Sequence, residues 1–285
     1  MTILAFSGGR ALPFIAALLA LPPPFASAQE VKRWNGEPIW EAGLAGGGGW
    51  ISDYPGSDQA HLRGLVAPIV FYRGPVLRID REGMRGRLFG REDLELDLAA
   101  TASFNARDNR ARSGMPDLDY LVGVGPQLIY HGLHYVPGAP ALHLKLNATA
   151  STNLHRINGR GFSVESELRW RRGTVTDNAG EWTLSVGPTW ASGPLMRHFY
   201  EVAPQYATTT RPAYAARSGY LGTDLKLTIR RRAEASWSWF MEARAMSLHG
   251  AANRSSPLFR SSTGFALGAG VIWTPWQSEG RTTSD

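Results

Sequence analysis

Two pairs of side chains have the residue types that metal binding or hydrolysis would need. His131 and His134 form an H-x-x-H pair, which would supply two of the nitrogen ligands that zinc accepts. No carboxylate or third histidine is close to them in the sequence, so two solvated turn residues are the plainer interpretation. Ser151 and His155 could serve as the nucleophile and the base of a hydrolase. Nothing in the sequence supplies a third group that would orient the base.

Three acidic residues alternate with leucines, and paired carboxylates of this kind could serve catalysis in an aspartyl-type protease. Asp93, Glu95 and Asp97 stand two residues apart, which places them on one face of a β-strand. We expect their partners to be cations on neighbouring strands. The sequence therefore predicts no catalytic residue, no cofactor, no metal and no enzyme activity.

These residues belong to segments that alternate apolar and polar side chains. Successive side chains of a strand point to opposite faces, so each segment has one apolar face. These faces are Leu94, Leu96 and Leu98; Leu142, Leu144 and Leu146; Phe162, Val164 and Leu168; Leu221, Leu225, Leu227 and Ile229; and Trp237, Trp239 and Met241.

The length of these segments and the aromatic residues near their ends indicate a membrane barrel. Strands of about 10–13 residues exceed the usual length in globular proteins and suit a tilted bilayer crossing. Trp and Tyr at strand ends are typical of the belts at headgroup level. We predict an all-β fold, an antiparallel up-and-down transmembrane β-barrel, with a soluble β protein as the alternative.

Strand parity predicts about twelve strands, with ten as the alternative. A first division gives eleven, but single-chain bacterial barrels have even counts and short periplasmic turns. Dividing 75–89 at 81–83 restores both rules. The outer loops are then 52–60, 81–83, 105–117, 152–159, 192–217 and 249–261, and the periplasmic turns are 73–75, 90–91, 131–139, 172–180 and 231–234. Pro126 and Pro188 fall inside strands, where we expect bulges or local breaks.

The N-terminus has the pattern of an export signal. Arg10 precedes the apolar run 11–21, prolines follow at 22–24, and Ala26-Ser27-Ala28 has the small-residue pattern of a cleavage site. We predict a signal peptide at 1–28, a barrel at 29–276 and a polar tail at 277–285. The 285 residues include no cysteine, which excludes a disulfide scaffold and Cys-ligated metals.

Several blocks in order along the chain are similar to one family. Gly46 to Gly49 precede Asp53-Tyr54-Pro55-Gly56-Ser57, and later blocks surround Phe199-Tyr200 and Ser256-Pro257. Together they resemble the MltA-interacting protein (MipA/OmpV) family of outer-membrane proteins. The matching motif residues are Gly47, Gly48, Gly49, Tyr54, Pro55, Gly56, Ser57, Pro68, Tyr72, Gly74, Tyr200, Ser256 and Pro257.

The resemblance implies a scaffold of the cell outer membrane. It would link a lytic transglycosylase to a penicillin-binding protein that synthesises murein, in contact with membrane lipid and lipopolysaccharide and without nucleic acid. The alternatives are a porin-like channel for small solutes, with 192–217 as its gating loop, and a surface adhesin.

Charges expected to face the lumen mix both signs. A selective pore tends to show rings of one sign, whereas a mixed set indicates ion-pair ladders across neighbouring strands. We therefore expect a narrow or plugged lumen, with a small-solute channel as the alternative. The expected lumen-facing residues are Asp93, Glu95, Asp97, Lys145, Glu165, Glu167, Arg169, Arg171, Asp224, Lys226, Arg230, Glu242 and Arg244.

Overall fold

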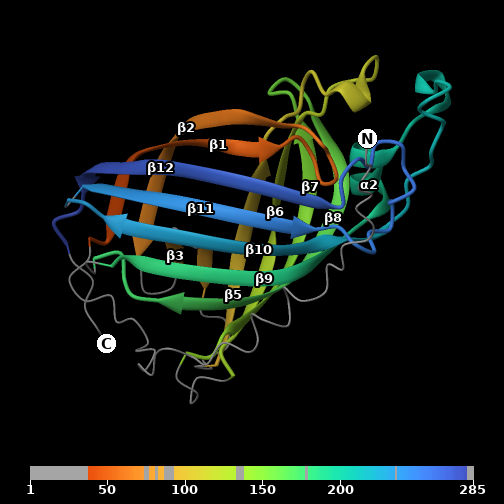
Figure 1. Ribbon diagram of the computed structural model, residues 1–285. Coiled ribbons are helices and arrows are strands. Elements are labelled where there is room, and N and C mark those ends of the chain that lie inside the picture. The colour runs from red at the N-terminus through yellow and green to blue at the C-terminus, as the bar shows by residue number, and fades with distance from the viewer. Residues whose placement is uncertain are drawn as a thin grey trace, which may run out of the picture.

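The chain forms a ring of antiparallel strands, each paired with its neighbours in the sequence and the last with the first (Figure 1). The computed structural model describes residues 38–73, 77–80, 83–86, 93–132, 138–176, 179–234 and 236–280. The predicted signal peptide lies outside the described residues and stays a prediction. The strands are β1 (Trp40–Ser52), β2 (Ala60–Arg73), β3 (Leu77–Asp80), β4 (Gly83–Gly86), β5 (Leu94–Ser103), β6 (Tyr120–Tyr130), β7 (Ala141–Thr152), β8 (Ile157–Arg172), β9 (Glu181–Ala191), β10 (Gly219–Arg232), β11 (Trp237–Ser247) and β12 (Thr263–Gln277).

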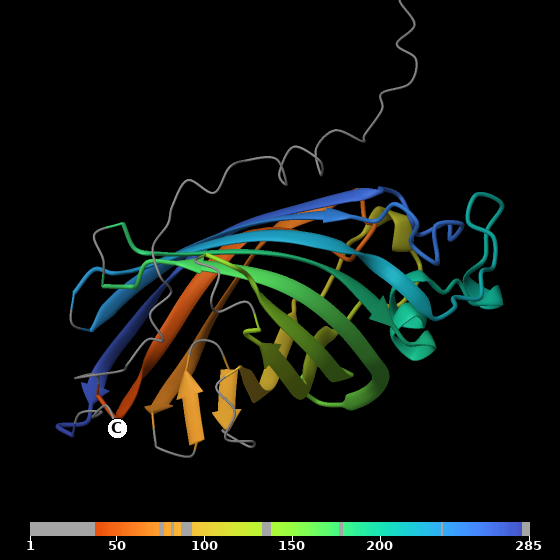
Figure 2. The same ribbon diagram turned by 90° about the horizontal axis from the view of Figure 1, so that it is seen from below.

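The predicted antiparallel barrel of about twelve strands is confirmed. Ten strands have 10 to 16 residues, whereas β3 and β4 have four each. β3 and β4 form the hairpin expected from dividing 75–89. The ring is therefore closed by ten tall strands and one low hairpin, which is visible as short orange arrows in Figure 2.

The alternation of the sequence becomes an inner and an outer face. On β6, Leu121 and Gln127 are buried at 8% and 3% exposure, whereas Val122 and Val124 between them are 44% and 50% exposed. Exposed aromatic rings stand near the strand ends: Trp40, Trp50, Tyr72, Tyr130, Trp182, Trp190, Trp237 and Trp276. No helix in the described part of the chain is long and apolar enough to cross a membrane.

The two prolines inside strands mark local breaks rather than shifts of register. At Pro126 of β6 the pairing with β7 is interrupted and then resumes in the same register. Pro188 of β9 interrupts the pairing with β8 in the same way. Each follows a glycine, Gly125 or Gly187, whose missing Cβ lets a carbonyl of the neighbouring strand approach. The ladder thus tolerates two missing N–H donors.

One strand departs from the expected alternation. β10 has an irregularity of register between Tyr220 and Gly222, so the residue between them changes face. Leu221 was expected on the outer face with Leu225, but it is buried at 7% exposure in an apolar cluster. The expectation for Leu221 was therefore wrong, because a bulge shifts the period by one residue.

Both described ends of the chain lie at one rim of the barrel, where the Ile39 amide donates to the Gly280 carbonyl at 3.1 Å. The opposite end holds the longer loops. These contain the 3-10 helices η1 (Arg110–Arg112) and η2 (Pro204–Tyr206) and the helix α2 (Gly193–Tyr200). The sequence analysis treated 192–217 as a plain loop and did not foresee α2, although Pro194 in its first turn is a common helix-start signal.

Candidate functional site

The loops at the end away from the described chain ends pack into one body, which we call the loop cap. It comprises residues 53–59, 104–119, 192–218 and 248–262, seen on the right of Figure 1. Phe259 of the last segment packs against a buried core that the other segments and adjoining strands supply. This core is Tyr54, Ala106, Leu118, Leu121, Ala191, Leu195, Met196, Phe199, Tyr200 and Leu221.

The turn Tyr54–Ser57 docks the first loop onto the last. Gly56 has a φ of +88°, in the left-handed region that favours glycine. The Phe259 ring lies where a Cβ on this glycine would project. The Gly56 carbonyl accepts the amides of Arg260 and Ser261 at 2.7 and 3.0 Å. A glycine is required here both for the backbone angle and for the space.

Three hydroxyls of motif residues bind backbone carbonyls across the cap. Tyr200 donates to the Pro55 carbonyl at 2.8 Å, and Ser256 donates to the Tyr200 carbonyl at 2.7 Å. Tyr54 donates to the Leu258 carbonyl at 2.8 Å. Buried carbonyls without partners are costly, so these bonds fix how the loops meet. Motif residues up to about 200 positions apart in sequence thus meet at one place.

A buried carboxylate anchors the beginning of the cap. The Asp53 side chain is fully buried and accepts bonds from His61 Nδ1 at 2.7 Å and Arg63 Nη2 at 2.5 Å. Asn109 Nδ2 donates to its other oxygen at 2.7 Å and to Ser57 Oγ at 3.1 Å. The charge of this carboxylate is therefore satisfied by three donors, as a buried charge requires. Two of them lie on β2 and the third lies in the second cap segment.

Burial keeps several titratable groups of the cap neutral at neutral pH. It raises the pKa of Tyr54 to about 12 and raises the pKa of Tyr200 still further above the ordinary range. The pKa of His198 falls to about 3, because burial and then the charges of Arg160 and Arg112 disfavour its protonation. These three side chains are therefore uncharged at neutral pH and contribute to the cap by packing and hydrogen bonding.

Two arginines join the second and third cap segments through carbonyl oxygens. Arg112 donates to the Phe199 carbonyl at 3.2 Å and to the Pro116 carbonyl at 3.3 Å. Arg211 donates to the Ala111 carbonyl at 3.0 Å. Both side chains span from one loop to the other, so the two loops are fixed relative to each other.

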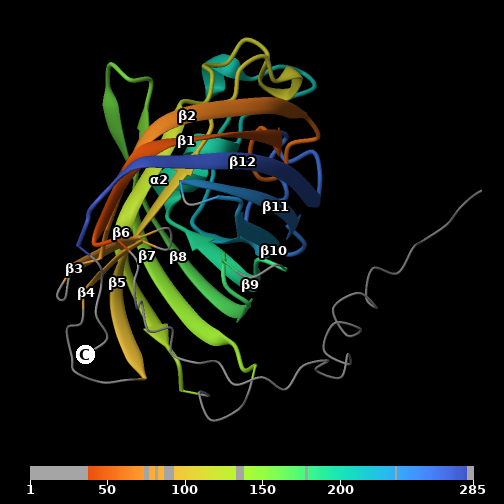
Figure 3. The ribbon, with the colours of Figure 1, turned by 90° about the vertical axis from the view of Figure 1, so that its left-hand side faces the viewer.

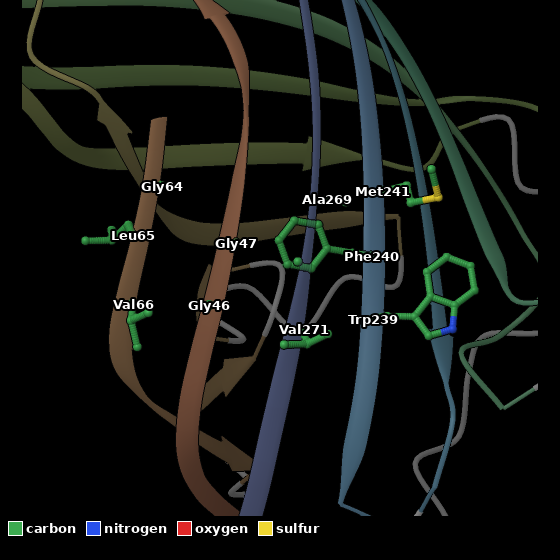
Figure 4. A pocket seen from close by; sticks show the side chains of 11 residues that line it. Gly46, Gly47, Gly64, Leu65, Val66, Trp239, Phe240, Met241, Ala269 and Val271 are labelled. Carbon is green, nitrogen blue, oxygen red and sulfur yellow. The ribbon is translucent and has the colours of Figure 1, made fainter. Parts of the chain in front are cut away.

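The three motif glycines Gly47, Gly48 and Gly49 lie in the wall, on β1, rather than in the cap. Gly47 of β1, which Figure 4 labels, pairs with Gly270 of β12, and Gly49 pairs with Gly268. The Phe240 ring of β11 lies beside the places where side chains on Gly47 and Gly270 would project. Gly48 lies between them and presents no side chain to the opposite face. This region of the wall is therefore thin.

An open apolar groove of about 710 Å³ crosses the same region. Its lining comes from four neighbouring strands: Gly46, Gly47, Gly64, Leu65, Val66, Trp239, Phe240, Met241, Ala269, Gly270 and Val271.

The remaining motif residues have different positions. Pro68 and Tyr72 are exposed on the outer face of β2, and Pro257 is half-buried in the last cap segment. Gly74 lies outside the described residues.

The inner face of β7–β11 carries most of the residues expected to face the lumen. In the structure Asp97 and Glu167 are buried and Arg244 is exposed. The others are half-buried: Asp93, Glu95, Lys145, Glu165, Arg169, Arg171, Asp224, Lys226, Arg230 and Glu242.

Opposite charges meet across neighbouring strands of this arc. Lys145 Nζ of β7 lies 2.7 Å from a carboxylate oxygen of Glu167 and 3.5 Å from one of Glu165, both on β8. Arg169 Nη2 contacts the other oxygen of Glu167 at 2.9 Å. The chain thus places a cation between acids rather than a ring of one sign.

A second set of pairs lies further round the barrel. Arg244 Nε of β11 is 2.6 Å from Asp224 of β10, and Arg230 of β10 is 3.9 Å from Glu181 of β9. Glu242 accepts a bond from the Thr228 hydroxyl at 3.3 Å. These contacts are ladders between adjacent strands.

The three acids at the start of β5 do not pair with one another as catalytic acids would. Asp97 accepts from Gln127 Nε2 at 3.3 Å and from the Leu98 amide at 2.6 Å. Glu95 lies 3.8 Å from His131. Asp93 precedes the strand.

The residues considered for hydrolysis or metal binding have other partners. Ser151 accepts from Arg160 Nε at 2.8 Å, and the His155 ring bonds to the Asn153 carbonyl at 3.2 Å. His134 lies outside the described residues. Within the described ranges, no group of three or more metal-binding side chains is found.

The sequence analysis did not identify the cap residues Asp53, His61, Asn109 and Arg112 as site residues. Asp53 adjoins the recognised Tyr54–Ser57 block, which was the available signal. The contacts of Asn109 and Arg112 join residues that lie 52 to 87 positions apart, and no local pattern reports such distances.

Comparisons with known proteins were made for the whole chain. A family model described as MltA-interacting protein MipA matches residues 44–275, which include both the cap and the charged arc. No curated protein matches. Among solved structures, the crystal structure of an outer membrane channel from Pseudomonas putida F1 has a TM-score of 0.39 and 12% identity, covering 85% of this chain and 98% of that chain.

Proposed function

This chain belongs to the MltA-interacting protein MipA family, and we propose that it is a non-enzymatic scaffold of the outer membrane. It binds a lytic transglycosylase of the MltA type at the periplasmic rim of the barrel, and through that contact it brings a murein synthase close. The barrel serves as the membrane anchor. The family match supports the partner class, and the structure supports the choice of rim.

The loop cap is the observation on which the choice of rim rests. Its hydroxyls and amides are engaged with one another, and Met196, Leu248 and Leu258 at its centre have no exposed surface. Side chains used in this way are unavailable to a partner. The opposite rim, where the described ends of the chain lie, is the remaining end of the barrel.

Basic residues stand at the described strand ends of that rim. Arg230, Arg231 and Arg232 end β10, and Arg231 is exposed. Arg169, Arg171 and Arg172 end β8, which is separated from β10 by β9. The Arg232 amide donates to the Val175 carbonyl at 2.6 Å, which ties two turns together. A partner with an acidic surface complements such a rim, because opposite potentials steer and orient association.

Co-purification under gentle extraction tests the proposal. The tagged mature protein is solubilised in mild detergent with a lytic transglycosylase of the MltA type, and retention of that enzyme is measured. We expect retention by the wild type and a clear loss on Arg231→Glu combined with Arg232→Glu. Arg254→Glu, an exposed charge reversal in the loop cap, is the matched control and should retain the enzyme.

Two results would contradict the scaffold. One is absence of retention by a folded wild-type barrel, whose unboiled gel band shifts on boiling. The other is equal loss from rim and cap variants. Discrete conductance steps in a planar bilayer, together with absence of retention, would favour the channel alternative.

A further inference from the structure

Four consecutive strands place three cations in one row on the inner face of the wall. Arg169 of β8 pairs with Ser185 of β9. Ser185 pairs in turn with Lys226 of β10, and Lys226 pairs with Arg244 of β11. Figure 3 shows β8 to β11 following one another round the wall, and all four strands lie within the described ranges. We call these four residues the cation row, because it contains no acid.

Lys226 and Arg244 stand directly opposite each other in this row. Like charges at directly opposed positions of neighbouring strands destabilise a sheet. Asp224 lies two residues before Lys226 and therefore on the same face of β10. Its carboxylate is 2.6 Å from Arg244 Nε, so the nearest acid along the strand neutralises the arginine and not the lysine.

The Lys226 ammonium forms no hydrogen bond or ion pair with another residue in the part of the chain that the structure describes. Two acids, Glu167 and Glu242, attract it from a greater distance, and two cations, Lys145 and Arg169, repel it. Glu167 already contacts Lys145 at 2.7 Å and Arg169 at 2.9 Å. Its charge is therefore shared between two closer cations.

Lys145 shows how the chain satisfies a lysine on the inner face. Its side chain is 10% exposed, and its ammonium lies 2.7 Å from Glu167 and 3.5 Å from Glu165. Lys226 is half-buried as well, but it has no such contact. A charge that is removed from bulk water needs a partner. The partner of Lys226 must then come from the solution inside the barrel.

The groups beside Lys226 are donors of the kind that bind oxyanions. Arg244 contacts Asp224 through Nε, and its guanidinium carries further N–H donors. The Arg244 side chain is 45% exposed, so solutes can reach it. Ser185, on the other side of Lys226, supplies a hydroxyl. Ammonium and guanidinium groups together bind phosphate and carboxylate through charge-assisted hydrogen bonds.

We propose that Lys226, Arg244 and Ser185 form a subsite for an oxyanion group, a phosphate or a carboxylate, of a small solute inside the barrel. The anion lies between the two opposed cations and relieves their repulsion. This goes beyond the scaffold, because it concerns the inner face of the wall and not the rim. Either proposal can fail without the other.

Labelling of lysine amines tests the subsite in the wild-type protein, whose chain has three lysines. The aldehyde of pyridoxal phosphate condenses with an amine to an imine, releasing water, and borohydride reduces the imine to a stable amine. Pyridoxal, which has the aldehyde but no phosphate, is the matched probe. The refolded barrel is treated with each probe, and modification of Lys226 and Lys145 is quantified by mass spectrometry of their peptides.

We expect pyridoxal phosphate to modify Lys226 several-fold more than pyridoxal does, and several-fold more than it modifies Lys145. Inorganic phosphate or succinate should suppress the modification of Lys226, and chloride at the same ionic strength should not. The stronger competitor identifies the preferred oxyanion. Equal modification by the two probes, suppression by chloride alone, or no suppression by either oxyanion would overturn the proposal.

Unfolding in the presence of phosphate gives a second test. A ligand that binds only the folded state stabilises it, so phosphate should raise the denaturant midpoint of the wild type above that in chloride at equal ionic strength. Lys226→Met should lose this rise, and Lys226→Gln makes the same test if the methionine variant does not fold. Arg254→Met, which removes an exposed cation of the loop cap, is the matched control and should keep it.

Two results of the unfolding experiment would overturn the subsite. One is the absence of any rise in the wild type, and the other is a rise of equal size in a folded Lys226 variant. Each sample must keep the gel shift on boiling, which shows that the barrel is folded before denaturant is added.

Discussion

The loop cap and the middle of β2 bury their side chains to very different extents. In the cap, four loops bury Tyr200 and Met196 to 1% and 0% exposure and join through hydroxyl–carbonyl bonds. On β2, a regular strand leaves Leu65 and Val66 mostly exposed. The burial of a side chain in this molecule thus depends on how many segments meet around it, and not on whether it belongs to a strand or a loop.

Truncating the centre of the cap should give the largest effect. Tyr200→Ala removes a buried ring and its bond to Pro55, and we expect a loss of about 3–5 kcal/mol in the free energy of unfolding. Denaturant unfolding in lipid vesicles measures it. Tyr206→Ala, at a half-buried position of η2, is the control and should lose much less. Equal losses would show that the cap has no common core.

Removing Lys145 from the charged arc on the inner face should have the next largest effect. Lys145→Met removes the lysine that contacts both Glu165 and Glu167, and Arg169 remains in contact with Glu167, so we expect a loss of about 2–4 kcal/mol. Arg244→Met, whose side chain is 45% exposed, should lose no more than about 1 kcal/mol. The same unfolding assay compares them, and the reverse ranking would contradict this view of the charged arc.

Acid should weaken the cap through His198. Its pKa of about 3 in the folded state is below the value of about 6.5 expected when unfolded, so the unfolded chain binds the proton first. Stability from this group is complete above pH 6.5 and falls as the pH drops towards 3. Between pH 6.5 and 5 we expect a decrease of about 2 kcal/mol.

Stability measured against pH in wild type and His198→Gln checks this expectation. The variant should lack that part of the decline. An unchanged slope in the variant would show that the histidine does not have to charge on unfolding.

Deleting one hydroxyl should have a smaller effect. Tyr200→Phe keeps the ring but leaves the Pro55 carbonyl without its donor, so we expect about 1 kcal/mol. Comparison with Tyr200→Ala in the same assay separates packing from hydrogen bonding in the cap. A loss as large as that of the alanine variant would mean that the bond, rather than the buried ring, holds the loops.

The sequence predicted the wall better than the cap for a physical reason. Strand alternation is local, so the twelve strands and the division of 75–89 followed from period and parity. The bulge that buries Leu221 and the helix α2 interrupt that period and were missed.

The cap depends on contacts between distant residues, as between Tyr54 and Leu258. The family resemblance identified several of these residues, but their meeting could only be seen in the fold.

The smallest expected effect tests the comparison most directly, because it applies one substitution to both regions. Leu65→Ala on β2 removes a side chain that is 59% exposed, so little burial is lost and the free energy of unfolding should fall by under about 1 kcal/mol. Leu221→Ala in the cap core removes one that is 7% exposed and should cost about 2–5 kcal/mol. Denaturant unfolding of the pair in the same vesicles gives the difference. Similar costs would mean that Leu65 is packed against protein in the membrane, which would contradict the comparison.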